Sequence, residues 1–126
     1  MALPGMDNIT NLLSTFLDVQ SRRAEVVAGN LANADTPGFR AKEVDFDDFL
    51  KNAAREALTP GGNQNQLSTT PGIVDQESAT IGIDGNTVDS SREMATLAEA
   101  GGKYITGAQL LQMRFRTLRM AIREGK

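Results

Sequence analysis

Three aspartates, Asp45, Asp47 and Asp48, form an acidic run whose carboxylates have the chemistry of a metal site or an acid–base pair. Alternating carboxylates are typical of calcium loops, and paired carboxylates can act as general acid and general base. A second motif, at residues 84–86, reads Asp-Gly-Asn and has the composition of a tight turn. Neither motif completes the calcium-loop spacing, and no cluster of bases accompanies the acids. We therefore interpret both as solvated loop residues and predict no catalytic residue, no metal ligand and no cofactor-binding residue.

The residue types that the chain lacks exclude further classes of site. Among its 126 residues there is no cysteine and no histidine. Disulfides and thiolate metal sites are thereby excluded, as is imidazole as a general base or metal ligand. No glycine-rich loop follows a predicted strand, so a phosphate-binding loop is not predicted. We expect a protein that is not an enzyme and that has neither a cofactor nor a small-molecule substrate.

The charges are unevenly distributed although the net charge is only −3. Residues 40–88 hold eight acids against four bases, whereas residues 114–126 hold five bases against one acid. A basic helix end can complete the helix dipole, bind nucleic acid or lie on an anionic membrane. The bases alternate with apolar residues of a helix seam, so no nucleic-acid partner is predicted. A membrane-surface helix remains an alternative.

Membrane-spanning and targeting segments are not predicted. No stretch approaches the roughly 18 apolar residues that span a bilayer. The N-terminus lacks the basic region, apolar core and cleavage site of a secretory signal. We therefore expect a cytosolic chain, unless an export route without a cleaved signal carries it.

Residues 7–34 are predicted to form an amphipathic helix. Its apolar residues recur at helical spacing and define a seam that comprises Ile9, Leu12, Phe16, Val19 and Val26. The same repeat places two polar residues, Arg23 and Asn30, on the seam, where polar side chains set register and partner choice. A drifting seam would instead turn both toward solvent. Pro37 ends the helix because it restricts the residue before it.

Residues 89–123 are predicted to form a longer helix, with Ser90 or Ser91 as its N-cap. Its seam keeps unbroken steps of three and four and comprises Met94, Leu97, Gly101, Tyr104, Ala108, Leu111, Phe115, Leu118 and Ile122. Because the phase survives across Gly101-Gly102, we predict a continuous helix rather than an interruption there. Gly101 and Ala108 would let another backbone approach closely.

The middle of the chain, residues 35–88, has the composition of an irregular loop region. Residues 51–58 could form two helical turns, and residues 59–66 are too polar to bury themselves. Two short apolar runs, at residues 73–74 and 81–83, fit strands. The turn at residues 84–86 could close a short β-hairpin.

Together these elements predict a mainly α, single domain over residues 1–126. It would comprise an N-terminal helix (7–34), a loop region (35–88) and a C-terminal helix (89–123). The second helix would be about 52 Å long, which exceeds a compact globule of this chain length. We therefore expect an elongated, coiled-coil-like helix pair. Two helices bury little, so helices from other copies or partners are expected to complete the core.

The segment at residues 28–39 resembles the signature of the flagellar rod, hook and axial-protein family. The shared pattern is a helix end with two spaced asparagines, followed by Thr-Pro-Gly and an aromatic residue. The matching residues are Asn30, Asn33, Thr36, Pro37, Gly38 and Phe39. Residues 40–46, residues 84–94 and the short length resemble the proximal-rod members of that family. Gly29, where alanine is more usual, and the pair Gly101-Gly102 depart from the pattern.

The resemblance implies a structural subunit of the proximal rod of the bacterial flagellar basal body, which assembles through its terminal helices and helps transmit torque. It also implies unfolded export through the flagellar type III gate and a periplasmic location in the rod. The implied partners are further copies, the rod protein FlgC and other rod proteins, the adaptor FliE and the MS ring. The alternatives are a non-axial coiled-coil adaptor or scaffold, and a peripheral membrane-binding amphipathic helix protein.

Overall fold

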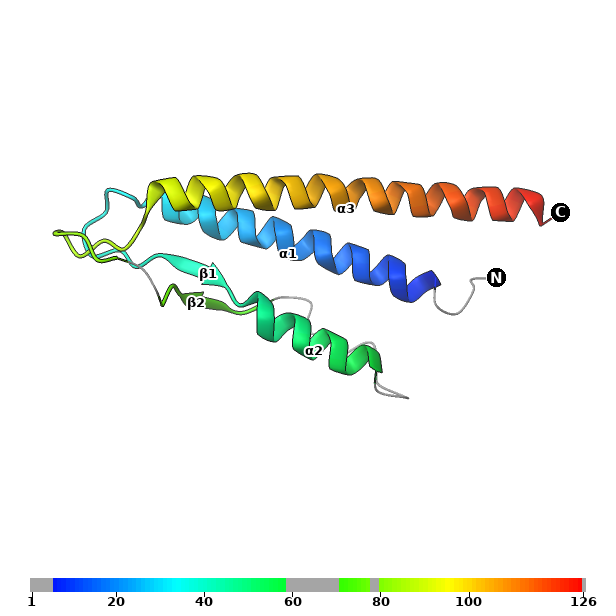
Figure 1. Cartoon of the computed structure of the whole chain (residues 1–126), viewed down its shortest axis with the longest axis horizontal. Helices are drawn as coiled ribbons and strands as arrows, with labels where there is room; N and C mark the ends of the chain where they lie inside the picture. The colour runs from blue at the N-terminus through cyan, green and yellow to red at the C-terminus, as the bar shows by residue number, and fades with distance from the viewer. Residues whose placement is uncertain (1–5, 59–70, 78–79, 126) are drawn as a thin grey trace.

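The chain forms an elongated molecule built on two long antiparallel helices (Figure 1). The computed structural model describes residues 6–58, 71–77 and 80–125. The elements in chain order are α1 (Met6–Ala32), β1 (Lys42–Val44), α2 (Phe46–Leu58), β2 (Ile73–Asp75) and α3 (Ser90–Glu124). The helices α1 and α3 run side by side, and α2 lies on the other side of α1 in this view. The predicted mainly α helix pair is confirmed.

The longest element, α3, runs through Gly101-Gly102 without a break, as predicted. Its N-cap differs from the prediction, because the Asp89 carboxylate, and not a serine, accepts hydrogen bonds from the N–H groups of Ser91 and Arg92. Asp89 sits one residue before the helix, where its side chain reaches the first free N–H groups. A carboxylate there also complements the helix dipole.

Close approach between α1 and α3 occurs at Gly107 and not at the predicted Gly101. A Cβ added to Gly107 would lie 3.0 Å from both Phe16 and Leu17 of α1, whereas one added to Gly101 would meet nothing within 4 Å. The absence of a side chain at Gly107 therefore lets α1 pack against the backbone of α3.

The small sheet pairs distant strands rather than forming the predicted local hairpin. β1 and β2 are antiparallel, with Lys42 opposite Asp75, Glu43 opposite Val74 and Val44 opposite Ile73. Residues 81–83 form no strand. The turn predicted after them is present, since the Gly82 N–H bonds the Asn86 carbonyl at 2.8 Å and Gly85 adopts a φ of 80°. This turn contacts residues 36–39 instead of closing a hairpin.

Helix α2 begins five residues earlier than the predicted turns at residues 51–58. Its first turn contains Asp47 and Asp48, which complement the positive helix end, and Phe46, Phe49 and Leu50 share one face. The prediction for residues 59–66 lies outside the described residues. Within the described ranges, no helix is both long and apolar enough to cross a bilayer.

Candidate functional site

The predicted seams are only partly covered inside the single chain. Val19 is buried, and Ile9, Leu12, Met94, Tyr104, Phe115 and Ile122 are exposed. The remaining large apolar seam residues are half-buried: Phe16, Val26, Leu97, Leu111 and Leu118. In α3 the buried positions are Glu93, Ala100 and Gly107, which also recur every seven residues. They lie one residue before Met94, Gly101 and Ala108, so this part of the predicted seam is displaced from the buried line, whereas Leu97, Leu111 and Leu118 stay half-buried beside it.

The first motif residue, Asn30, ties together three separate elements at the loop end of the molecule. Its Nδ2 donates to the Lys42 carbonyl at 2.8 Å and to Glu93 Oε2 at 3.0 Å, and its Oδ1 accepts from the Lys42 N–H at 2.9 Å. Gln76 Nε2 donates to the other oxygen of Glu93 at 2.7 Å. The side chains of Asn30 and Glu93 are each 1% exposed. A buried carboxylate is costly without such donors, so this network is a specific join between α1, β1 and α3.

Asn86 closes the C-terminal end of α1. Its Nδ2 donates to the carbonyl oxygens of Asn33, Ala34 and Thr36 at 2.8–2.9 Å. Its Oδ1 accepts from the Val88 N–H at 2.7 Å. These carbonyls belong to the turn that follows α1, which ends at Ala32, so this single buried amide holds the turn against residues 84–88.

The other motif residues form the turn to which Asn86 donates its hydrogen bonds. Asn33 donates to the Gly29 carbonyl at 2.8 Å, and the Thr36 hydroxyl donates to Asn33 Oδ1 at 3.2 Å. Pro37 and Gly38 are exposed, and Gly38 adopts a φ of 74°. Such a left-handed conformation favours glycine. Its N–H bonds the Asp84 carbonyl at 3.0 Å.

Ala41 and Thr87, which lie outside the motif, add further hydrogen bonds at this end of the molecule. The Phe39 carbonyl accepts from the Thr87 N–H at 3.0 Å, and the Thr87 hydroxyl accepts from the Ala41 N–H at 2.7 Å. Phe39 is half-buried. We name the contacts of residues 30–42 with Gln76 and residues 84–93 the loop junction. From the sequence, Asn86 was expected only in a tight turn, and Gln76 had no predicted role. Thr87 and Glu93 lie in the segment 84–94 that carries the family resemblance, but a resemblance does not name their partners in the fold.

The acidic run, Asp45, Asp47 and Asp48, lies at the start of α2 and makes contacts there. Asp45 Oδ1 accepts from the Asp48 N–H at 3.3 Å, which places Asp45 as a cap on α2, and Lys51 lies 3.8 Å from Asp48. In the described part of the chain no three acidic side chains converge as they would around a metal ion.

Two exposed carboxyls carry perturbed pKa values. A hydrogen bond from Lys42 lowers the pKa of Asp75, and the charges of Lys42 and Arg40 lower it further. The bond joins the two strands. A hydrogen bond from Lys103, with the nearby charge of Arg23, lowers the pKa of Glu99.

The two polar seam residues of α1 both face α3. Arg23 lies 3.7 Å from Glu99, and Asn30 bonds Glu93. The contacts therefore favour the interpretation in which Arg23 and Asn30 set the register between the two helices. They do not support the alternative, in which a drifting seam turns both side chains toward solvent.

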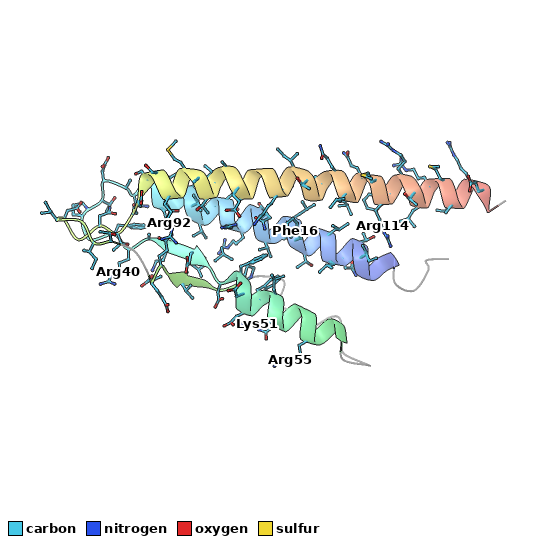
Figure 2. All side chains as sticks on the ribbon, viewed as in Figure 1. Phe16, Arg40, Lys51, Arg55, Arg92 and Arg114 are labelled. Carbon is cyan, nitrogen blue, oxygen red and sulfur yellow. The ribbon has the colours of Figure 1, made fainter. Side chains whose placement is uncertain are left out.

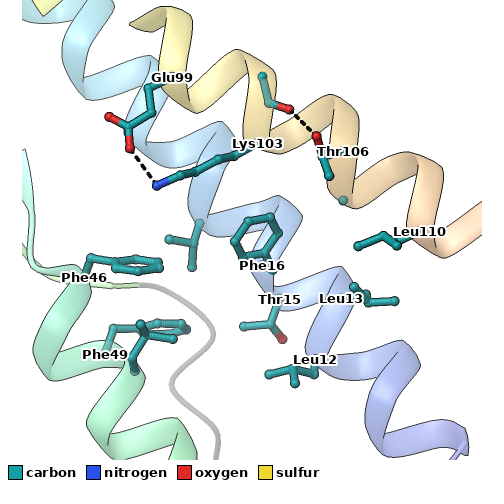
Figure 3. A pocket seen from close by; sticks show the side chains of 14 residues that line it. Leu12, Leu13, Thr15, Phe16, Phe46, Phe49, Glu99, Lys103, Thr106 and Leu110 are labelled. Carbon is teal, nitrogen blue, oxygen red and sulfur yellow. Dashed lines mark hydrogen bonds and ion pairs between the residues drawn. The ribbon is translucent and has the colours of Figure 1, made fainter. Parts of the chain in front are cut away.

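An open apolar groove of about 640 Å³ lies between all three helices (Figure 3). α1 contributes Leu12 and Phe16, and α2 contributes Phe49 and Leu50. The wall from α3 includes Gly102, Thr106, Gly107 and Leu110. The lining is mainly apolar, and its charged members, Glu99 and Lys103 of α3, pair with each other at 2.7 Å.

Comparisons with known proteins cover the Asn-to-Phe motif. The family model described as flagella basal body rod protein matches residues 17–40, which include the whole Asn-to-Phe motif. The chain is 32% identical to the flagellar basal body rod protein FlgB of Escherichia coli (strain K12), over 98% of this chain and 99% of the relative. It is 30% identical to FlgB of Salmonella typhimurium and 28% identical to FlgB of Proteus mirabilis (strain HI4320), with the same coverage.

Proposed function

This chain belongs to the FlgB family of flagellar basal body rod proteins, and we propose that it assembles into the rod through the exposed faces of its two long helices. It is a structural subunit of the proximal rod and not an enzyme. In our proposal its mechanism is mechanical. Interlocked helices carry torque from one subunit to the next without any chemical step.

The observation that supports this proposal is the wide distribution of exposed apolar residues around α3. Met94, Ile105, Met113, Phe115 and Ile122 are between 46% and 71% exposed. Their sequence positions place them on several faces of one helix. Helices that are apolar on many sides are normally surrounded by other elements, so this helix fits an assembly better than a free surface.

We assign the exposed seam residues of α1 and α3, such as Leu12, Phe115 and Ile122, to this assembly role, and the loop junction to holding the two helices in register. The N-terminal motif from Asn30 to Phe39 would thus act indirectly, by setting the geometry with which α1 and α3 meet neighbouring subunits. The hydrogen bonds of Asn30 and Asn86, which tie α1 to residues far along the chain, support that assignment.

Specific partners are part of the proposal. Besides further copies of itself, we propose FlgC and other rod proteins, the adaptor FliE and the MS ring as neighbours. We further propose a periplasmic position in the rod, reached through the flagellar type III export gate without a cleaved signal. Family membership supports these assignments at the level of a rod component.

The test is complementation of a strain that lacks its own FlgB. A tagged copy of this chain should restore swimming, and the tag should co-purify with isolated hook–basal bodies and cross-link to neighbouring rod proteins. Swimming restored while the tag is absent from the basal bodies would overturn the rod proposal. Flotation with anionic liposomes measures the membrane-surface alternative, and we expect the purified chain to remain unbound.

A further inference from the structure

The interior of the molecule is built largely from polar side chains. Among the largest side chains that are fully buried, Gln20, Asn30 and Glu93 are polar, and only Val19 is apolar. Burial of apolar surface is the main source of stability in a folded chain, and large polar side chains are seldom buried completely. Polar groups thus occupy positions that apolar residues fill in most helix pairs.

The buried positions of α3 add little apolar volume to the contact with α1. Besides Glu93 they are Ala100 and Gly107. Phe16 of α1 points toward α3 (Figure 2), and a Cβ added to Gly107 would lie 3.0 Å from the Phe16 ring. Small residues let two helices approach closely, but each of them buries few carbon atoms. Close approach of the backbones, rather than a row of large apolar side chains, therefore brings α3 against α1.

Gln20 lies near the middle of α1, on the face that is turned toward α3. It follows Phe16 by four positions and precedes Arg23 by three, so the three residues share one face of the helix. Phe16 lies against Gly107, and Arg23 lies 3.7 Å from Glu99. Because α1 and α3 are antiparallel, Gln20 faces the stretch of α3 between these two contacts.

The side-chain oxygen of Gln20 is buried without a hydrogen-bond partner among the described residues. Asn30 and Glu93 differ in this respect, because they bond each other. The Nε atoms of Arg22 and Arg114 also lack a partner in the described part of the chain, but both side chains are partly exposed. An unpaired buried oxygen destabilises a fold, because it gives up its bonds to water and gains none in exchange. Gln20 therefore weakens the contact between α1 and α3.

We propose that Gln20 lowers the stability of the α1–α3 pair so that the two helices separate readily and pair again. The hydrogen bond between Asn30 and Glu93 selects the register of the helices, and Gln20 limits how tightly they hold it. A chain built in this way opens at low cost and returns to the same register. The inference rests on the proposed function, in which the chain passes an export gate unfolded and folds again in the rod.

Amide hydrogen exchange of the purified full chain measures how often the helices separate. Gln20→Met keeps an unbranched side chain and removes the amide. We expect backbone amides in the middle of α1 and α3 to exchange about tenfold more slowly in this variant, because its buried side chain needs no hydrogen bond. Gln109→Met makes the same change at an exposed position of α3 and should leave the exchange rates within about twofold of the wild type.

A second substitution, Gln20→Leu, removes the amide with a side chain of different shape, so the result does not depend on how methionine packs. Slower exchange in either variant supports the inference. Unchanged exchange in both would show that the buried amide costs the helix pair nothing. Faster exchange in both would show that the amide stabilises the pair where it lies, and either of these results would overturn the inference.

Export in the complemented strain separates the inference from the proposed function. Forced unfolding depends on how fast the folded chain opens, so about threefold more of the stabilised variant than of the wild type should remain inside the cell. Equal export of a variant that exchanges more slowly would overturn the role of Gln20 in export and leave the rod assignment intact. Absence of the wild-type chain from isolated rods would instead overturn the proposed function, whereas the exchange rates would still report the effect of Gln20 on the helix pair.

Discussion

Asn30 of α1 donates a hydrogen bond from Nδ2 to Glu93 Oε2 of α3 at 3.0 Å, although 63 positions separate them in the chain. Both side chains are 1% exposed. The same amide also pairs with both backbone groups of Lys42. One side chain thus links α1 both to α3 and to the start of the first strand, and a change in the register of α1 and α3 would break the bond to Glu93.

Asn30→Ala should lower the free energy of unfolding by about 3 kcal/mol, because it leaves the Glu93 carboxylate and the Lys42 backbone short of buried partners. Urea unfolding followed by circular dichroism measures the change. Asn11→Ala, at an exposed position of α1, is the matched control and should change the free energy by less than about 0.5 kcal/mol. Equal effects of the two substitutions would show that the junction is not specific.

Two glycines of α3, Gly107 and Gly102, should change the stability of the chain in opposite directions when each is replaced by alanine. Gly107→Ala should destabilise the free chain by about 2 kcal/mol, because the new methyl group would meet Phe16 and Leu17 at 3.0 Å. Gly102→Ala should stabilise it by about 1 kcal/mol through helix propensity. Thermal unfolding of the purified variants gives both values, and a loss of stability in Gly102→Ala would contradict the open space at that position.

Leu111→Asp should abolish rod assembly, since Leu111 is half-buried and a charge there lacks a compensating partner. Arg116→Asp, at an exposed position, should retain most of the function. The measurements are swimming and electron microscopy of isolated basal bodies. The membrane-surface alternative predicts the opposite order, because losing a base weakens attraction to anionic lipid.

The Asp75–Lys42 pair should contribute to holding β1 against β2 only above acid pH. The pKa of Asp75 is lowered in the folded chain from its ordinary value of 3.8, so the contribution is fully present above that value. It is lost as the pH falls through the folded pKa. Carboxyl NMR titration should give an Asp75 pKa below 3.8, and Lys42→Ala should return it toward 3.8. An unchanged titration in that variant would contradict the assigned cause.

The sequence alone predicted the two long helices, because helical periodicity is a local property that neighbouring residues carry. It also predicted the continuity of α3 and the turn at residues 84–86. The resemblance carried by Asn30 to Phe39 pointed to the rod family without any coordinates, since a motif needs only residue types and spacing.

The tertiary structure decided which face of α3 meets α1. A seven-residue repeat fits Met94, Gly101 and Ala108 as well as the positions one residue earlier, and apolar content favoured the first set. Inside the chain the contact uses the earlier positions, one of which is the charged Glu93. Its burial depends on amides of Asn30 and Gln76 that are distant in sequence. The pairing of β1 with β2 and the hydrogen bonds of Asn86 to the turn after α1 likewise depend on long-range contacts. Such contacts form only when distant parts of the chain come together on folding, so local patterns do not encode them.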